Sequence, residues 1–568
     1  MTTAWAAALM ALGACSLRAT DNRLSRLVED YSERLDGGAV APTRDYAPAR
    51  EYRDRAQLEK TPASVNPPAE ALPFDPAEPD RDVQARLDSY VEPGFAGTII
   101  DLPEAFRIAQ RSAREYLTAE EEYILAAISL LIERHRFSPR FFNDLSASAD
   151  GSFDTTNADT AIRIVNELRA TKQLTTGGSL EARLIWDAAQ TLREGVTGQY
   201  TSATSLVLDA NIPLLRGAGP VARESLIQAE RNLVYAARDF ERFRREFLVD
   251  IARDYFNLVA QQAAIANQER SLNSLLQSQQ RTAAQVEAGR LAAFETRRFE
   301  ERVLNTRNGL ITARERFLLS LDRFKVRLGL PVEEEIAIVP TRLEIPEPEI
   351  TPAHATALAM QYRLDLQVER DRVEDARRGV SNARNDLLPD LDLAANLTVG
   401  TDPNDEIGNF DFAFDEADYS ASVTFGLPLD RRIERLSLRR AMIGAERSRR
   451  TYDQFRDNVI VDARAAVRAI DEARFALDLA ERRVEINRLV LEQLKLEEAD
   501  SLEITDAEDQ LLGSENDRDD AVRDLRIAIL EYLLSTGTMR VTPGGQFQPL
   551  PGMGQIVLER EAPPVGQP

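Results

Sequence analysis

Two long stretches of the chain carry small and apolar residues at helical spacing. One lies between Pro213 and Pro331 and the other between Pro428 and Pro543, and in both these residues recur every three or four positions. At about 1.5 Å per residue, about sixty helical residues form a rod on the order of 90 Å long. One helix filling either stretch would end in empty space, so each stretch is predicted to fold as an antiparallel helical hairpin.

The two stretches are copies of one unit. With Arg223 aligned to Arg435, an offset of 435 − 223 = 212, residue types recur without a gap. Such a repeat predicts an internal duplication, and by itself it supports only a long antiparallel coiled coil. The other matched pairs are Ser225 and Ser437, Leu226 and Leu438, Ala229 and Ala441, Phe243 and Phe455, Arg244 and Arg456, Val249 and Val461, and Asp250 and Asp462.

Each predicted hairpin turns at a tip. We place the first tip at Val286–Thr296, around Gly289, and the second near Glu497–Asp506. A further helix is predicted to precede each hairpin, one from Asp101 to about Phe137 and a shorter one that begins after Pro352 and runs to Leu388. Asp101 is the expected N-cap of the first, with proline in the first turn.

Between each leading helix and its hairpin the apolar period changes from 3.6 to 2. Four strands are predicted, at about 142–153, 203–215, 390–400 and 418–428, each with one apolar and one wet face. Segments of about ten residues suit tilted strands that cross a bilayer. A soluble antiparallel sheet with one buried face is the alternative. The first half also carries an insert, 155–199, which we expect to hold an additional hairpin strand or a strand extension.

The N-terminal segment ends in the only cysteine of the chain. Met1–Ala14 is small and apolar and Cys15 follows it, which favours a lipoprotein-type signal peptide over a plain apolar start. No Lys or Arg precedes Cys15, so the usual basic segment is missing. The predicted domains are 1–14, signal; 15–97, a lipidated extended tether with a short helix at 23–35; 98–330, the first repeat; 331–352, a linker; 353–540, the second repeat; and 541–568, a flexible tail.

Composition excludes several functional classes. The formal net charge is −24, which argues against binding to nucleic acid. With one Cys and only His135 and His354 as histidines, neither a His/Cys metal site nor a His-based triad is expected. We therefore expect no enzyme, no cofactor and no bound metal. No segment after the N-terminus is apolar over the roughly 20 residues that a membrane-spanning helix needs.

The order of helix, strand pair and long hairpin, occurring twice, resembles the outer membrane factor family of TolC-like channels. The resemblance covers roughly 98–540 and rests on several local matches. In one of them, Tyr362–Leu366, Leu364 stands where the family has proline. These matches are Asn211–Gly217 and Gly426–Asp430 after the second strand of each half, Asn385–Leu391 before the first strand of the second half, Tyr362–Leu366, and Glu287–Gly289 at the first tip.

The resemblance implies a fold of mixed α and β structure, mainly long α-helices. It implies a homotrimer in which each chain gives about four strands to a shared transmembrane β-barrel and its helices to a periplasmic tunnel. The implied function is an outer-membrane exit duct of an efflux pump or type I secretion system. Its partners would be a periplasmic adaptor protein, an inner-membrane transporter and outer-membrane lipid.

The resemblance also assigns residues to the tips. In Leu502–Ala507, Glu503 and Asp506 match the acidic positions that narrow the periplasmic entrance, and three copies would form carboxylate rings. The alternative is that both are solvated acids on a helix surface, as we expect for Glu508 and Asp509. The residues expected to dock the adaptor are Gly289, Arg290, Leu291, Ser501 and Leu502.

Two other functions remain to be weighed. A coiled-coil scaffold without a channel would explain the helices, but it needs neither the alternating strands nor the lipid attachment site. An acid-dependent hydrolase would need paired carboxylates, and the sequence offers only scattered ones. The transported substrate cannot be read from the residues.

Overall fold

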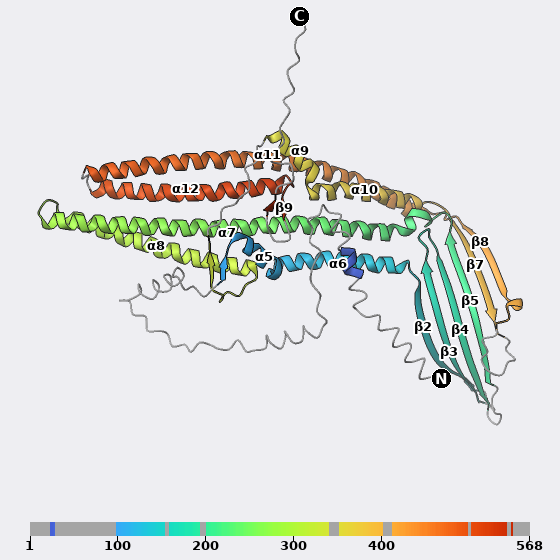
Figure 1. Ribbon diagram of the computed structural model, residues 1–568. Helices are drawn as coiled ribbons and strands as arrows, with labels where there is room; N and C mark the ends of the chain where they lie inside the picture. Colours follow the sequence, from blue (N-terminus) through green and yellow to red (C-terminus); the bar gives the residue numbers. More distant parts are fainter. Residues whose placement is uncertain are drawn as a thin grey trace, which may run out of the picture. The chain divides into compact units, whose positions relative to one another are not determined.

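A computed structural model gives the fold of the chain (Figure 1). It describes residues 23–28, 98–153, 158–193, 200–339, 351–401, 412–497, 501–541 and 547–548. The chain divides into two compact units. The first unit holds the described residues of 1–27, 122–239 and 365–456, and the second holds those of 28–121, 240–364 and 457–568. Residues 23–28 are helical, within the short helix predicted there.

Both long hairpins form as the spacing predicts. The first consists of α7 (Glu224–Glu287) and α8 (Ala293–Leu328), and the second of α11 (Arg432–Leu496) and α12 (Ser501–Ser535). With 64 and 65 residues, α7 and α11 are each close to 100 Å long at about 1.5 Å per residue. Near the first tip, Leu275 of α7 packs on Phe299 and Val303 of α8, and all three are buried.

Each predicted leading helix is two helices. The first is divided into α5 (Leu102–Ser112) and α6 (Arg114–Arg136), and the second into α9 (Pro352–Tyr362) and α10 (Leu364–Asn385). Asp101 caps α5 as predicted, accepting a hydrogen bond of 2.7 Å from the amide of Glu104.

Close contact with a glycine explains both breaks. Ala113 and Arg363 have extended backbone angles and interrupt the helices. Gly329 ends α8 with φ 78°, and a Cβ there would lie 2.1 Å from the carbonyl oxygen of Ser112. Gly537, which follows α12 with φ 70°, would place a Cβ 2.8 Å from the carbonyl of Tyr362. Each hairpin therefore ends on the break of a leading helix, at a spacing only glycine permits.

The main sheet has six antiparallel strands, where four were predicted. The insert forms two of them, and each is paired with a neighbouring strand on both sides. The strand order is β2-β3-β4-β5-β7-β8. The strands are β2 (Arg140–Phe153), β3 (Ala158–Gln173), β4 (Ser179–Arg193), β5 (Tyr200–Pro213), β7 (Asp390–Gly400) and β8 (Asp418–Gly426).

Short strands occupy segments that were predicted to lack them. In the linker, β6 (Ile336–Ile338) pairs in parallel with β1 (Thr98–Ile100). At the start of the predicted tail, β9 (Arg540–Val541) pairs with β10 (Phe547–Gln548). The buried guanidinium of Arg244 donates a hydrogen bond of 2.6 Å to the carbonyl of Val541, which joins β9 to α7.

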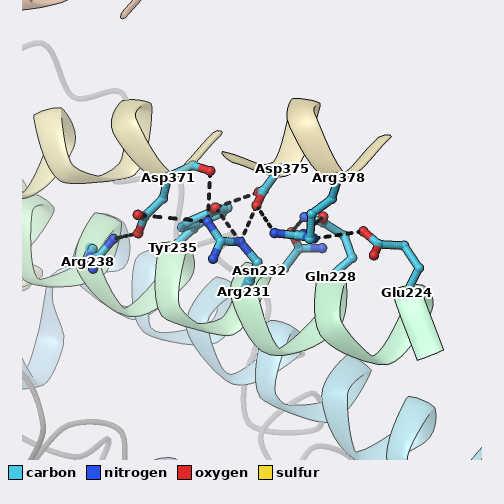
Figure 2. Close-up of polar contacts among 9 residues, drawn as sticks. All are labelled: Glu224, Gln228, Arg231, Asn232, Tyr235, Arg238, Asp371, Asp375 and Arg378. Atoms are coloured by element: carbon cyan, nitrogen blue, oxygen red, sulfur yellow. Dashed lines mark hydrogen bonds and ion pairs between the residues drawn. The ribbon is translucent and has the colours of Figure 1, made fainter. Parts of the chain in front are cut away.

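A polar cluster joins α7 to α10 in the first unit (Figure 2). Asp375 of α10 accepts a hydrogen bond of 2.6 Å from the hydroxyl of Tyr235 and forms an ion pair with Arg231, both on α7. Arg238 pairs with Asp371 at 2.7 Å, and Arg378 with Glu224 at 3.3 Å. Burial, followed by the bond to Asp375, raises the pKa of Tyr235 to about 12. The phenol therefore keeps its proton and remains a donor.

Candidate functional site

The six-stranded sheet has one apolar and one polar face along its whole width. The strand register aligns the predicted apolar residues in rows that cross the sheet, for example Phe141, Ala170, Ala182, Leu208, Leu397 and Tyr419. A polar row runs beside it on the opposite face: Arg140, Thr171, Glu181, Asp209, Asn396 and Ser420. The wet and apolar faces predicted for the four strands are confirmed, and β3 and β4 share them.

Arginine–carboxylate pairs cover the polar face. Arg183 of β4 pairs with Asp209 of β5 at 2.7 Å, and Asn396 of β7 donates a hydrogen bond of 2.7 Å to the same carboxylate. Arg169 of β3 lies 3.5 Å from Asp144 of β2. Arg183 also lies 3.3 Å from Glu181 of its own strand. Arg163 of β3 pairs with Asp187 of β4, and its Nε donates to one carboxylate oxygen at 2.9 Å.

The sheet is open at both ends. The terminal strands β2 and β8 have a partner on one side only, within the part of the chain that the structure describes. Side chains from Asp418 to Phe425 in β8 are all exposed. An edge of this kind presents unpaired amide and carbonyl groups to another strand.

The tip of the first hairpin has the predicted position. Gly289 has φ 71°, and the amide of Arg290 donates a hydrogen bond of 2.9 Å to the carbonyl of Gln285, which closes the end of α7. Arg290 and Leu291 are exposed there. At the second tip, Ser501 is the first residue of α12 and the side chain of Leu502 is exposed.

The predicted gate residues occupy the first turns of α12. Glu503 and Asp506 are both exposed, and neither carboxylate has an ion pair among the residues that the structure describes. They lie three residues apart, so they share one side of the helix. In a single chain they have the environment of solvated surface acids.

Glu508 and Asp509 are different, and the prediction that both are solvated acids is wrong. Glu508 is 4% exposed and forms an ion pair of 2.6 Å with Lys495 of α11. The hydroxyl of Ser274, on α7, donates a second hydrogen bond of 2.5 Å to the same carboxylate oxygen. Asp509 pairs with Arg302 of α8. One turn of α12 is thereby tied to the first hairpin as well as to its own partner.

Further polar contacts continue this connection along α12. Arg270 of α7 pairs with Glu515 at 3.1 Å, and Asn267 donates a hydrogen bond of 3.0 Å to Asp519. We call these contacts, together with those of Glu508 and Asp509, the hairpin links. They hold the two long hairpins together near their tips, and they would have to break if the hairpins separated there.

Sequence reasoning missed the hairpin links, although one signal was present. Lys495 is one of only four lysines in a chain that has 70 basic residues in total, and it stands thirteen positions before Glu508, across the tip. Residues on opposite sides of a hairpin tip can face each other, and a rare lysine there is a candidate partner for an acid on the returning helix. The contribution of Ser274 comes from the other hairpin and has no counterpart in the local sequence.

Three other predictions concern sites or absences. Cys15 and the signal peptide lie outside the described residues. No cluster of metal-binding side chains occurs in the described parts of the chain. Among the helices in those parts, none is both long and apolar enough to cross a membrane.

Comparison with known proteins gives one family and one fold. The sequence profile of the outer membrane efflux protein family matches residues 356–529. No curated protein matches the chain in sequence. The fold is similar to that of the outer-membrane channel OprN, with a TM-score of 0.58 and 16% identity over 79% of this chain and 91% of OprN.

Two further solved structures have the same fold. One is the outer membrane protein VceC from Vibrio cholerae, with a TM-score of 0.57 and 14% identity over 77% of this chain and 96% of VceC. The other is the open state of the outer membrane channel MtrE from Neisseria gonorrhoeae, with a TM-score of 0.56 and 15% identity over 77% of this chain and 88% of MtrE. The resemblance read from the sequence is confirmed: the outer membrane efflux protein profile matches residues 356–529, and the fold of the chain is similar to that of outer-membrane channels.

Proposed function

We propose that the protein is an outer-membrane exit duct that works as a homotrimer. The observation that carries this proposal is the open six-stranded sheet, which has one apolar and one polar face. In the described chain its edge strands β2 and β8 each have a partner strand on one side only. In lipid every backbone amide and carbonyl must be paired, so a sheet that spans a bilayer closes on itself. One chain cannot close it, whereas β8 of one copy can pair with β2 of the next.

Exposed apolar side chains on α11 support the same assembly. Ile433 is 76% exposed and Leu436 is 62% exposed, although both are large aliphatic residues near the start of the helix. Contiguous apolar surface of this kind is typical of a face that another protein covers. In the proposed trimer, helices of a neighbouring copy cover it and extend the barrel as a tunnel.

The hairpin tips form the proposed periplasmic entrance. Glu503 and Asp506 would each form a ring of three carboxylates, which favours cations and narrows the opening. The hairpin links hold this entrance closed. A periplasmic adaptor protein would dock on Gly289, Arg290, Leu291, Ser501 and Leu502, and an inner-membrane transporter would supply the energy, so the duct itself needs no cofactor.

The neighbours of known structure support a channel over a scaffold. OprN and MtrE are described as outer-membrane channels, and MtrE as a channel in an open state. A scaffold has no use for a sheet with an apolar face along its whole width. Lipidation at Cys15 would add an anchor on the periplasmic side of the outer membrane.

The proposal is tested by purifying the full chain in mild detergent and inserting it into liposomes. We expect native mass spectrometry to give three copies per particle. Liposomes carrying the protein should release a trapped small cation faster than empty liposomes do. A monomer that stays in solution without detergent and releases nothing would contradict the duct and favour the scaffold.

A further inference from the structure

The hairpin of β3 and β4 is a full part of the sheet. The register of β3 on β2 runs without a break from Arg140↔Thr171 to Phe153↔Ala158. On the other side, β4 pairs with β5 from Ser179↔Asn211 to Gln190↔Tyr200. With 16 and 15 residues, both inserted strands are as long as β2 and β5, which have 14 each. A hairpin added to the end of a sheet would leave β2 and β5 paired to each other instead.

The two faces of the sheet continue through the hairpin. Leu168 and Leu184 are neighbours on the apolar face, in the same row as Leu206 of β5. On the opposite face, Arg169 and Arg183 are neighbours in the row of Val207. A hairpin that projected into water would have no reason to keep one face apolar in step with its neighbours.

The turn between β3 and β4 is fixed to the main chain beside it. The carbonyl of Thr176 accepts a hydrogen bond of 2.8 Å from the amide of Gly219, which follows β5. Gly178 has φ 86°, and a Cβ there would lie 2.2 Å from the carbonyl oxygen of Asn211. This contact needs glycine, so the turn is packed against the first half of the fold.

The hairpin also supplies arginines to carboxylates on both flanking strands. Arg169 of β3 pairs with Asp144 of β2, and Arg183 of β4 pairs with Asp209 of β5. Arg140 is the only basic residue that the described polar rows of the other four strands carry. The polar rows of the hairpin itself carry four arginines and four carboxylates, so the hairpin brings basic partners to Asp144 and Asp209 without changing the net charge of the face. These residues are Arg163, Arg169, Arg183, Arg193, Asp159, Glu167, Glu181 and Asp187.

We propose that the β3–β4 hairpin forms part of the barrel wall, where it widens the pore and pairs its arginines with Asp144 and Asp209 of the flanking strands. This inference rests on the proposed trimeric duct. Three chains with six strands each give eighteen strands, whereas four strands from each chain would give twelve. Barrels of about eighteen strands enclose an aqueous channel. Since diameter grows roughly linearly with strand number, the barrel is about 1.5 times as wide. The duct can pass solutes that a twelve-stranded exit of the same design excludes.

The topology permits a direct test by deletion. β2 and β5 run antiparallel to one another, because three successive antiparallel pairings separate them. Replacing residues 154–199 with a short Asn-Gly turn would therefore let β2 pair with β5 in the orientation they already have. We call this variant the four-strand form.

The width of the pore is measured by the largest thiol reagent that still reaches a cysteine in the barrel. The reagents are added outside the membrane, so the periplasmic entrance does not limit their access. Ser420→Cys places a thiol on the polar face of β8, and Ala421→Cys places one on the apolar face. Cys15 is the only native cysteine, and the chain without added thiols is the background control. Maleimide-linked polyethylene glycols of increasing mass are added to proteoliposomes, and labelling is read as a shift in mass.

We expect Ser420→Cys to react and Ala421→Cys to stay protected by lipid. In the four-strand form, the largest polymer that still labels Ser420→Cys should be distinctly smaller than in the full chain. Equal limits in both forms would overturn the wall assignment, because the hairpin would then not set the width. If Ser420→Cys and Ala421→Cys react equally in the full chain, the sheet is not a barrel and the proposed function itself fails.

A second pair of thiols tests the hairpin even if the four-strand form does not fold. Glu181→Cys lies on the polar face of β4 and Ala182→Cys on the apolar face. If the hairpin is in the wall, water-soluble reagents label the first and not the second. Labelling of both would place the hairpin in water and overturn the inference while leaving the trimeric duct intact.

The charge of the lumen is tested separately with the hairpin in place. In the variant Arg169→Gln with Arg183→Gln, Asp144 and Asp209 lose their basic partners. Asp209 is two strands from Ser420, about 10 Å away. We expect the rate ratio of a cationic to an anionic thiol reagent at Ser420→Cys to rise about fourfold, without a change in the polymer limit. An unchanged ratio would contradict the pairing of these two arginines with the carboxylates of the lumen.

Discussion

The substitution Lys495→Met tests whether the hairpin links hold the entrance closed. Glu508 is 4% exposed, and its contacts are Lys495 at 2.6 Å and Ser274 at 2.5 Å. Removing the lysine leaves a buried carboxylate with a single hydroxyl donor. Breaking a fully buried ion pair in this way costs about 3–5 kcal/mol, and an exposed pair is worth at most about 1 kcal/mol.

Lys495 itself is 31% exposed, so we expect an intermediate loss of about 2 kcal/mol from the closed state. If this contact breaks on opening, the open-to-closed ratio rises roughly 30-fold per chain. Single-channel recording gives that ratio directly from the open probability. The matched control is Arg482→Met on the same helix, which removes an exposed pair of 2.9 Å with Asp478.

A double variant separates the loss of the link from general damage to the helix. Lys495→Met combined with Glu508→Gln should open less readily than Lys495→Met alone, because the amide leaves no unpaired buried charge. A Lys495→Met channel that opens no more often than the Arg482→Met control would refute the reasoning.

Three other predictions follow from the packing and the sequence. The pKa of Tyr235 is about 12 in the folded protein, whereas an unfolded tyrosine ionises near pH 10. The stabilising effect of Tyr235 is therefore complete below pH 10 and is lost as the pH rises toward 12. Tyr235→Phe should unfold at a lower temperature than the parent protein at pH 8, and this difference in unfolding temperature should shrink by pH 11. Gly329→Ala should destabilise the folded protein by about 2 kcal/mol or more, because the added Cβ would meet the Ser112 carbonyl at a residue with positive φ. Gly379→Ala on α10 adds a Cβ that meets nothing within 4 Å and should stabilise the helix slightly. Denaturant unfolding of the two variants measures both effects. Cys15→Ser should abolish incorporation of labelled fatty acid, and label retained by the variant would exclude that site.

The sequence was sufficient where local pattern decides structure. The strand 390–400 has the predicted bounds, because turn residues flank the alternating segment from Leu391 to Val399 at both ends. The tip at Gly289 was placed correctly, since a glycine there permits the left-handed turn that closes α7. Apolar residues at helical spacing over about sixty residues predict the long helices α7 and α11.

The inserted strands were harder to predict because their alternation is impure. Asn166 and Lys172 fall on the apolar face of β3, and Val165 falls on the polar face. The hydrophobic period therefore weakens in the middle of the segment, although the strand itself is unbroken. Pairing on both sides, by β2 and β4, supplies what the local pattern lacks.

Tertiary contacts decided the remaining features. The helix breaks at Ala113 and Arg363 depend on glycines that are distant in the sequence, and neither break has a proline at its centre. The environment of Glu508 depends on Ser274, which is 234 residues away, so an acidic residue that reads as solvated is buried. Glu503 and Asp506 remain predictions, since their role depends on three chains meeting.

Single-channel recording of the purified trimer in a planar bilayer is the most direct test of the exit duct. The full chain is compared with the variant carrying both Glu503→Ala and Asp506→Ala. We predict stable trimers with a small, cation-favouring conductance, and a larger conductance with weaker cation preference in the double variant. Trimers that never conduct in either form would contradict the account.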